Sequence, residues 1–176
     1  MSARSPGSRG TWRYSGSLLM SSDQVVTFWP DGASSVPTSL TPTGPLYSQE
    51  LQSDTQPPCL TDPHGSSTPG TSVELETCTG GYTQNVTVEA NGNLKLNGLC
   101  IDTAGGATAS GTAVVLNTCG SSSTQVWTQQ GPGQTLQNQG APGMCLYTPS
   151  ATKNTTPEIA ACSSGSQSQQ WWLPAM

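Results

Sequence analysis

The chain has 176 residues, the length of about one domain, and only 32% of them are apolar and 9% charged. Ser and Thr number 24 each, beside 20 Gly and 14 Pro, which excludes a coiled coil or another long-helix protein rich in Ala, Glu, Lys and Leu. The formal net charge of −5, with five Lys and Arg in total, has the wrong sign for a nucleic-acid partner. No apolar run approaches the roughly 20 residues that span a bilayer, so we expect no membrane partner.

Residues 1–45 lie outside the repeats that follow. The segments 11–19 and 24–29 are predicted strands, and 30–45, with four Pro, is typical of a linker. Two strands do not form a stable domain alone. We therefore predict an irregular or short-stranded N-terminal extension. It is the end of an upstream domain, a segment packed on the rest of the chain, or a disordered tail.

Six cysteines, an even number in a small hydrophilic chain, indicate a disulfide framework and hence a secreted, extracellular protein. Sequence alone allows fifteen pairings. Two Asn-x-Thr sequons, at Asn85 and Asn154, are compatible with a secreted glycoprotein. The apolar stretch at 17–20 is too short for a signal peptide, which favours a fragment, a mature form or an incomplete gene model of a secreted protein.

The cysteines recur with the sequence around them, which indicates an internal repeat. Each repeat has a first cysteine, an apolar-x-apolar segment that ends just before a second cysteine, and a glutamine a few residues later. Gln-x-Trp is intact in the second and third repeats, whereas Val86 replaces the Trp of the first. The three repeats are about 46–90, 91–135 and 136–174.

Short strand patterns separated by turns fill these repeats, and no helix-length periodicity occurs. The predicted strands are 46–49, 73–75, 86–89, 94–96, 114–116, 126–129 and 159–161. Asn91-Gly92 is typical of a tight hairpin turn. No repeat has enough apolar residues for a core of its own, so we predict an all-β body in which three repeats share one core.

This threefold pattern resembles the ricin B-type lectin family, also called carbohydrate-binding module family 13. The resemblance covers residues 46–174 and implies a β-trefoil, a barrel with a hairpin cap and pseudo-threefold symmetry. It implies that each repeat is closed by its own disulfide: Cys59 with Cys78, Cys100 with Cys119, and Cys145 with Cys162. The residues of the Gln-x-Trp motif are then structural: Gln84, Gln125, Trp127, Gln169 and Trp171.

In this family each repeat offers a sugar pocket, with an Asp two residues after the first cysteine and an aromatic residue two before the second. An acceptor for sugar hydroxyls and a flat apolar face are the two things that sugar recognition needs. The second repeat keeps the carboxylate as Asp102, and we predict that Asp102, Asn117 and Gln125 form the best-preserved site. Asn117 stands where the aromatic residue belongs.

The other two repeats depart further from the family pattern. The first has Thr61 at the Asp position, with the candidate Asp62 one place later, and Glu76 at the aromatic position. The third has the candidate Tyr147 at the Asp position. Because no repeat keeps its aromatic residue, Tyr147 or Tyr82 is an alternative source of a stacking face.

We expect no catalytic site in the chain. The only histidine, His64, lies in an Asp-Pro-His-Gly loop. The base of a Ser-His-Asp triad needs a fixed, buried position, which such a loop does not favour. Glu74 and Glu76 alternate with apolar residues on one strand, so they lack the facing geometry of a glycosidase pair. No Cys-x-x-Cys or His-x-x-x-His pattern indicates zinc, and we expect neither a metal nor a cofactor.

The resemblance implies a non-catalytic carbohydrate-binding module. Modules of this family are commonly attached to secreted glycoside hydrolases, so we expect this one to target such an enzyme to a glycan or polysaccharide. Galactose- and xylose-type sugars are the ligands that the resemblance implies, and we expect a monomer. Two alternatives stay open: a structural, protein-docking or inhibitory trefoil with degenerate sugar sites, and a C-terminal fragment of a glycosidase.

Overall fold

The computed structural model describes residues 18–19, 25–26, 42–48, 57–129 and 134–174. The chain forms two compact units, Met1–Leu40 and Thr41–Met176. In the first unit, β1 (Leu18–Leu19) pairs antiparallel with β2 (Val25–Val26). Both strands lie within the segments predicted as strands, 11–19 and 24–29. The other residues of these two segments, and residues 30–41 of the predicted linker, lie outside the described residues. The extension is therefore short-stranded where it is described.

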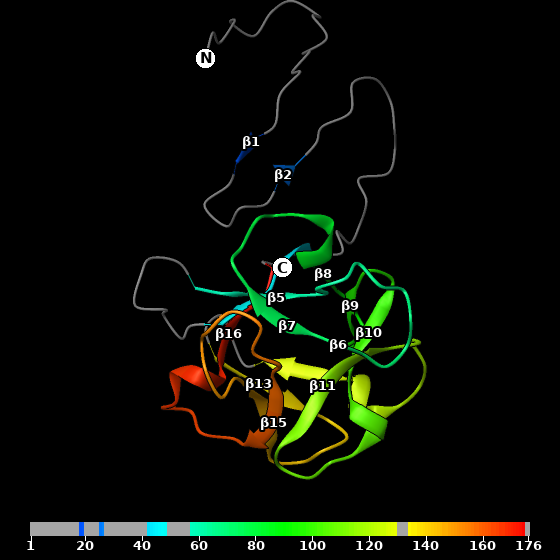
Figure 1. Cartoon of the computed structure of the whole chain (residues 1–176), viewed down its shortest axis with the longest axis vertical. Helices are drawn as coiled ribbons and strands as arrows, with labels where there is room; N and C mark the ends of the chain where they lie inside the picture. Colours follow the sequence, from blue (N-terminus) through cyan, green and yellow to red (C-terminus); the bar gives the residue numbers. More distant parts are fainter. Residues whose placement is uncertain (1–17, 20–24, 27–41, 49–56, 130–133, 175–176) are drawn as a thin grey trace, which may run out of the picture. The chain divides into compact units, whose positions relative to one another are not determined.

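The second unit is all-β and is drawn with its strand labels in Figure 1. In the described residues its strands are β3 (Thr43–Pro45), β4 (Tyr47–Ser48), β5 (Cys59–Thr61), β6 (Thr71–Ser72), β7 (Glu74–Glu76), β8 (Asn85–Val88), β9 (Leu94–Leu96), β10 (Leu99–Thr103), β11 (Thr112–Asn117), β12 (Trp127–Gln129), β13 (Gln134–Asn138), β14 (Met144–Tyr147), β15 (Glu158–Ala161) and β16 (Gln170–Trp172). Short 3₁₀ turns interrupt them at η1 (Tyr82–Gln84), η2 (Ala104–Gly106), η3 (Ser123–Gln125) and η4 (Gln167–Gln169). No helix among the described residues is long and apolar enough to cross a membrane.

One antiparallel hairpin forms the centre of each repeat: β5 with β7, β10 with β11, and β14 with β15. The register is the same in all three, since the first cysteine always faces the residue two before the second. Each hairpin is closed by its own disulfide, and the bonded cysteines are 19, 19 and 17 positions apart in the sequence. These are the three pairs that the family resemblance implies. Loops of this size restrict the unfolded chain and so stabilise the fold by roughly 3 kcal/mol each.

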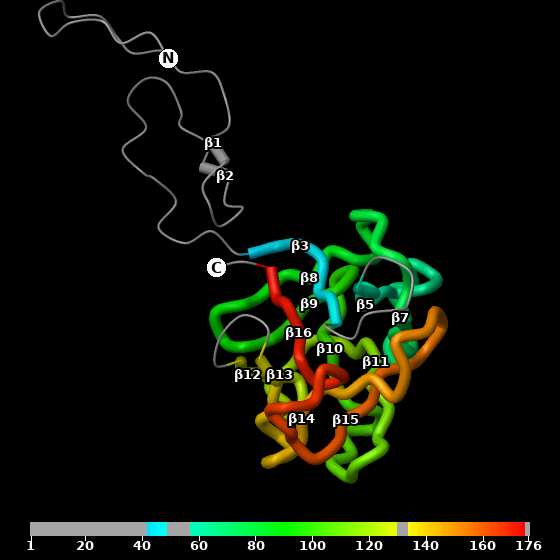
Figure 2. The backbone as a smooth tube through the Cα atoms, turned by 90° about the vertical axis from the view of Figure 1, so that its left-hand side faces the viewer, coloured from blue at the N-terminus to red at the C-terminus, as the bar shows by residue number. Residues whose placement is uncertain are grey.

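A second set of pairings joins the repeats to one another. The strand after each hairpin pairs with the first strand of the next repeat, β8 with β9 and β12 with β13. The last strand, β16, pairs with β13 and with β4 at the start of the unit, which closes the ring. Figure 2 shows the same unit from the side, with β3 beside β8. Because β3 pairs with β8, the sheet begins before residue 46.

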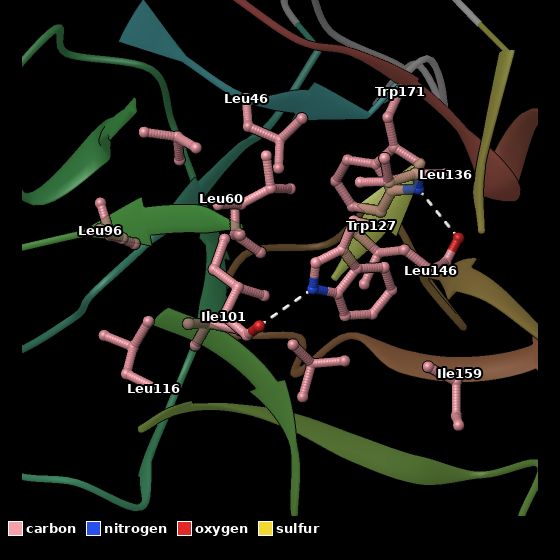
Figure 3. Close-up of a cluster of buried hydrophobic side chains, with 14 of the residues drawn as sticks. Leu46, Leu60, Leu96, Ile101, Leu116, Trp127, Leu136, Leu146, Ile159 and Trp171 are labelled. Carbon is pink, nitrogen blue, oxygen red and sulfur yellow. Dashed lines mark hydrogen bonds between the residues drawn. The ribbon is translucent and has the colours of Figure 1, made fainter. Parts of the chain in front are cut away.

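The shared core takes buried side chains from all three repeats (Figure 3). Among them are Leu46, Leu60, Ile101, Leu116, Leu146 and Ile159. Trp127 Nε1 donates to the Ile101 carbonyl and Trp171 Nε1 to the Leu146 carbonyl, each at 2.9 Å. The motif tryptophans thus fill the core and tie each 3₁₀ turn to the hairpin of its own repeat. In the first repeat the buried Val86 has no donor for such a bond.

Candidate functional site

Three equivalent positions lie two residues after each first cysteine, where the family resemblance implies a sugar-binding carboxylate. They are Thr61 at the end of β5, Asp102 in β10 and Tyr147 at the end of β14. The common register places each of them across from the second strand of its hairpin. The same backbone position therefore carries a hydroxyl group, a carboxylate and a phenol in the three repeats.

In the second repeat, neighbouring groups already bind the Asp102 carboxylate. Its Oδ2 accepts from Asn117 Nδ2 at 3.1 Å and from Gln125 Nε2 at 3.0 Å, and its Oδ1 accepts from the Thr103 backbone N–H at 2.7 Å. Asp102 is buried, with 4% of its surface exposed. The structure thus brings together the three residues predicted for this repeat, but it turns their polar groups toward one another.

The glutamine of the first repeat has a smaller partner. Gln84 Nε2 donates to Thr61 Oγ1 at 3.0 Å and to the Thr77 carbonyl at 2.9 Å. Its Oε1 accepts from the Thr79 backbone N–H at 2.7 Å. Thr61 Oγ1 in turn donates to the Cys59 carbonyl at 3.1 Å. The side chain of Thr61 is smaller than the hydrogen-bonded pair of Asp102 and Asn117 in the second repeat. This hairpin therefore leaves space in front of Gln84.

That space is a cavity of about 270 Å³, which we call the first-repeat pocket. It is lined by Thr61, Asp62, Pro63, Glu76, Thr77, Thr79, Thr83 and Gln84. Four threonines, two carboxylates and an amide make the lining strongly polar. Threonine hydroxyls and the Glu76 carboxylate are groups that can meet the hydroxyls of a single sugar ring.

Asp62 forms the junction between the pocket and the adjoining turn. Its side chain is fully buried, its Oδ1 accepts from the His64 backbone N–H at 3.3 Å, and its Oδ2 accepts from Asn97 Nδ2 at 3.1 Å. The Gly65 N–H closes the turn by donating to the Asp62 carbonyl at 3.3 Å. Asp62 thus lines the pocket and fixes the turn beside it, whereas His64 is exposed.

A loop of the third repeat supports the Glu76 wall of the first-repeat pocket. Lys153 Nζ lies 3.0 Å from Glu76 Oε2. Two backbone bonds of 2.8 Å bring this loop there, from the Leu75 N–H to the Thr155 carbonyl and from the Asn154 N–H to the Leu75 carbonyl. The pocket is thus lined by the first repeat, and one of its walls is supported by the third.

The third repeat offers less polar chemistry at its equivalent position. Gln169 Nε2 donates to the Ala161 carbonyl at 2.8 Å, and its Oε1 accepts from the Ser163 N–H at 2.6 Å. Tyr147 is half-buried and pairs with Glu158 of the same repeat. In the described part of the chain no group of three or more His, Cys, Asp or Glu side chains is arranged to hold a metal ion.

Sequence reasoning identified the positions of Thr61 and Glu76 but counted both as departures from the family pattern. Thr79 and Thr83 were missed, because two threonines in a chain with 24 carry no signal. Both precede the motif glutamine Gln84, and Thr83 lies directly before it in the 3₁₀ turn η1, which is the signal that could have identified them.

The family model of the ricin-type beta-trefoil lectin domain matches residues 47–171, and the comparison with curated proteins finds no match. Among solved structures, the designed 3-fold symmetric protein ThreeFoil is 21% identical, with a TM-score of 0.65 over 76% of this chain and 99% of that one. Agglutinin from Abrus precatorius is 17% identical, with a TM-score of 0.65 over 79% of this chain and 50% of that one.

A non-toxic homologue of type II RIPs from Momordica charantia, in complex with α-methyl-D-galactoside, is 20% identical. Its TM-score is 0.64 over 76% of this chain and 47% of that one. The matched region thus spans about half the length of each plant protein. These likenesses show the β-trefoil fold. The family match extends over most of the chain, which therefore belongs to the ricin-type β-trefoil lectin domain family.

Proposed function

We propose that this protein is a carbohydrate-binding module that holds one sugar residue in the first-repeat pocket. The observation that carries the proposal is a polar cavity at the Asp position of the only repeat whose glutamine faces a threonine. At about 270 Å³ the cavity lies just below the roughly 300–1,000 Å³ of pockets for drug-sized ligands. It therefore suits a single sugar ring better than an oligosaccharide.

The lining supplies both acceptors and donors. The ion pair with Lys153 engages Glu76 Oε2, and we assign Glu76 Oε1 to a sugar hydroxyl. The hydroxyl group of Thr83 acts as donor or acceptor as the ligand requires, whereas the Thr79 hydroxyl donates to Gln84 Oε1 and accepts from the Gly81 N–H. Gln84 holds Thr61, Thr79 and the 79–80 backbone in place through five hydrogen bonds, and it is a positioning residue here.

Galactose-type sugars are the first ligands to test and xylose-type sugars the second. One structural neighbour is described in complex with α-methyl-D-galactoside, which supports this order. We propose Asp102, with Asn117 and Gln125, as a second and weaker sugar site, since both of its carboxylate oxygens already accept internal hydrogen bonds.

Titration of the whole chain with methyl β-D-galactoside or methyl β-D-xyloside, followed by NMR or calorimetry, tests the proposal. We expect millimolar binding that shifts the signals of residues around the pocket. Glu76→Gln should weaken binding at least about fivefold, because a hydrogen bond to a charged group contributes more than a neutral one. Glu74→Gln on the same strand is the matched control, since Glu74 lies outside the pocket lining, and it should leave affinity unchanged.

Absence of binding to either sugar at tens of millimolar, or binding that ignores Glu76→Gln, would overturn the pocket assignment. Binding of an isolated partner protein by a chain that binds no sugar would support the docking alternative instead.

We also propose that the module is non-catalytic, monomeric and extracellular, and that it holds a secreted glycoside hydrolase near its substrate. Three disulfides support an oxidising compartment. Weak sugar binding becomes useful when tethering raises the effective concentration of the attached enzyme at the glycan surface. The rate of polysaccharide hydrolysis by an enzyme fused to the chain, with and without Glu76→Gln, measures this role.

A further inference from the structure

We infer that Tyr82 forms a second subsite at the mouth of the first-repeat pocket, where its ring stacks on the sugar residue linked to the one inside. The inference rests on the proposed function and extends it from a single sugar to a ligand of at least two rings. Tyr82 is the most exposed large hydrophobic side chain among the described residues, at 69%. An aromatic ring left open to water beside a polar cavity is a surface that a ligand can cover.

Tyr82 stands where two walls of the pocket meet. On one side the next residue, Thr83, lines the cavity, and so does Gln84. On the other side the ring reaches the turn that begins with Asp62 and Pro63, both of which line the cavity. Tyr82 itself is not part of the lining. Its ring therefore lies beside the lining rather than within it, and in this inference the next residue of the glycan chain covers it.

The phenol end of Tyr82 lies beside the turn that contains Gly65. A Cβ atom at Gly65 would lie 2.7 Å from the Tyr82 phenol oxygen and 3.5 Å from two ring carbons, so the two residues are in close contact. Gly65 also has a φ of +57°, a conformation that glycine adopts without strain. The buried Asp62 holds this turn through its bonds to the His64 N–H and to Asn97. The ring therefore adjoins the Asp62 side of the pocket.

The chemistry of the two subsites is complementary. The pocket offers oxygens and amides to sugar hydroxyls, whereas Tyr82 offers a flat face to the C–H groups of a pyranose ring. Glu76 occupies the position where the family has its aromatic residue, so the pocket lacks a stacking face of its own. The ligand class is therefore a disaccharide or longer glycan whose terminal residue enters the pocket.

Affinities of the wild-type chain for methyl β-D-galactoside and for lactose, which ends in the same sugar, test the inference. If the pocket takes xylose instead, methyl β-D-xyloside and xylobiose form the equivalent pair. We expect the disaccharide to bind about threefold to tenfold more tightly than the monosaccharide. Tyr82→Ala and Tyr82→Leu should abolish this preference and leave the monosaccharide affinity within about twofold of wild type. Tyr82→Phe should keep the preference, since the ring and not the hydroxyl carries it.

Trp172→Ala is the matched control. Trp172 is the other exposed large hydrophobic side chain, at 41%, and it lies in β16 opposite Tyr47, so its loss should leave both affinities unchanged. Equal affinities for the two sugars in the wild type would overturn the second subsite. So would an equal loss of both in Tyr82→Ala and Tyr82→Leu, or a loss in Trp172→Ala as large as in Tyr82→Ala. Failure to bind either sugar would instead remove the first-repeat pocket itself, and the inference with it.

Discussion

The first and second repeats fold around the same glutamine and differ in what it meets. Gln84 donates to the carbonyl of Thr77, and Gln125 to that of Thr118, seven residues upstream in both cases. In the second repeat the other amide hydrogen goes to a carboxylate that also takes an asparagine. In the first repeat it goes to one threonine hydroxyl.

This difference decides how many partners the acceptor opposite each glutamine needs. The Asp102 carboxylate and Asn117 satisfy each other, because a buried charge needs several hydrogen bonds to offset its lost hydration. Thr61 carries no charge, and its hydroxyl is bonded to Gln84 and to the Cys59 carbonyl beside the first-repeat pocket. A preserved family residue is thus evidence for the fold of its hairpin before it is evidence for a working site.

A second difference lies in the core. Trp127 fills the centre and donates to the Ile101 carbonyl, whereas the first repeat has the smaller Val86 at the matching place. At this place the first repeat fills less of the core, and it is also held to the others by strand pairing and by the 153–155 loop.

Replacing Trp127 by Val would give the second repeat the core of the first, and it has the largest expected effect. The change removes a buried indole and leaves the Ile101 carbonyl without its donor. We expect a loss of about 3–4 kcal/mol in the free energy of unfolding. Denaturant unfolding measures it, and the half-exposed Trp172→Val should cost less than about 1 kcal/mol. Equal losses in the two variants would mean that the core does not depend on the motif.

Asp102→Ala and Thr61→Ala compare the two glutamine partners directly. Asp102→Ala removes the acceptor of three hydrogen bonds from a buried site, so we expect a loss of about 2–3 kcal/mol in unfolding free energy. Thr61→Ala removes one side-chain acceptor, while Gln84 keeps its bond to the Thr77 carbonyl, and should cost about 1 kcal/mol.

Binding should follow the opposite order in these two variants. Thr61→Ala changes the lining of the first-repeat pocket and should alter sugar affinity, whereas Asp102→Ala should leave most of it. A larger loss of binding in Asp102→Ala, at equal folded fraction, would place the main sugar site in the second repeat.

The fold could be predicted from the sequence because its signals repeat. Cysteines, the Gln-x-Trp motif and apolar positions recur in phase, and they are the residues that close the hairpins and fill the core. Strands with mixed composition were missed, as in β13 (Gln134–Asn138), where only Leu136 and Asn138 are buried. The predicted strand 73–75 begins one residue too early, since Val73 lies in the break between β6 and β7. Short polar strands form because neighbouring strands hydrogen-bond to them, and a local sequence pattern carries no information about those neighbours.

The candidate site could be predicted only in part. Its backbone positions follow from the repeat, but the first-repeat pocket depends on the volume that Thr61 leaves. It also depends on the ion pair between Lys153 and Glu76. These two residues are far apart in the sequence, so no local pattern predicts their contact. Both are properties of packing between repeats.

Lys153→Gln has the smallest expected effect and tests the contribution of the third repeat to this pocket. Lys153 is 64% exposed, so its ion pair with Glu76 should stabilise the fold by no more than about 0.5 kcal/mol. Sugar affinity should fall about twofold, because Glu76 loses the contact that holds its carboxylate at the wall. Added salt should reduce wild-type affinity toward that of the variant. Lys95→Gln is the matched control: it breaks the 2.9 Å ion pair with Glu89, outside the pocket lining, and should change stability as little while leaving affinity intact. If both variants bind as wild type does, the third repeat supports the hairpin through its backbone bonds to Leu75 alone.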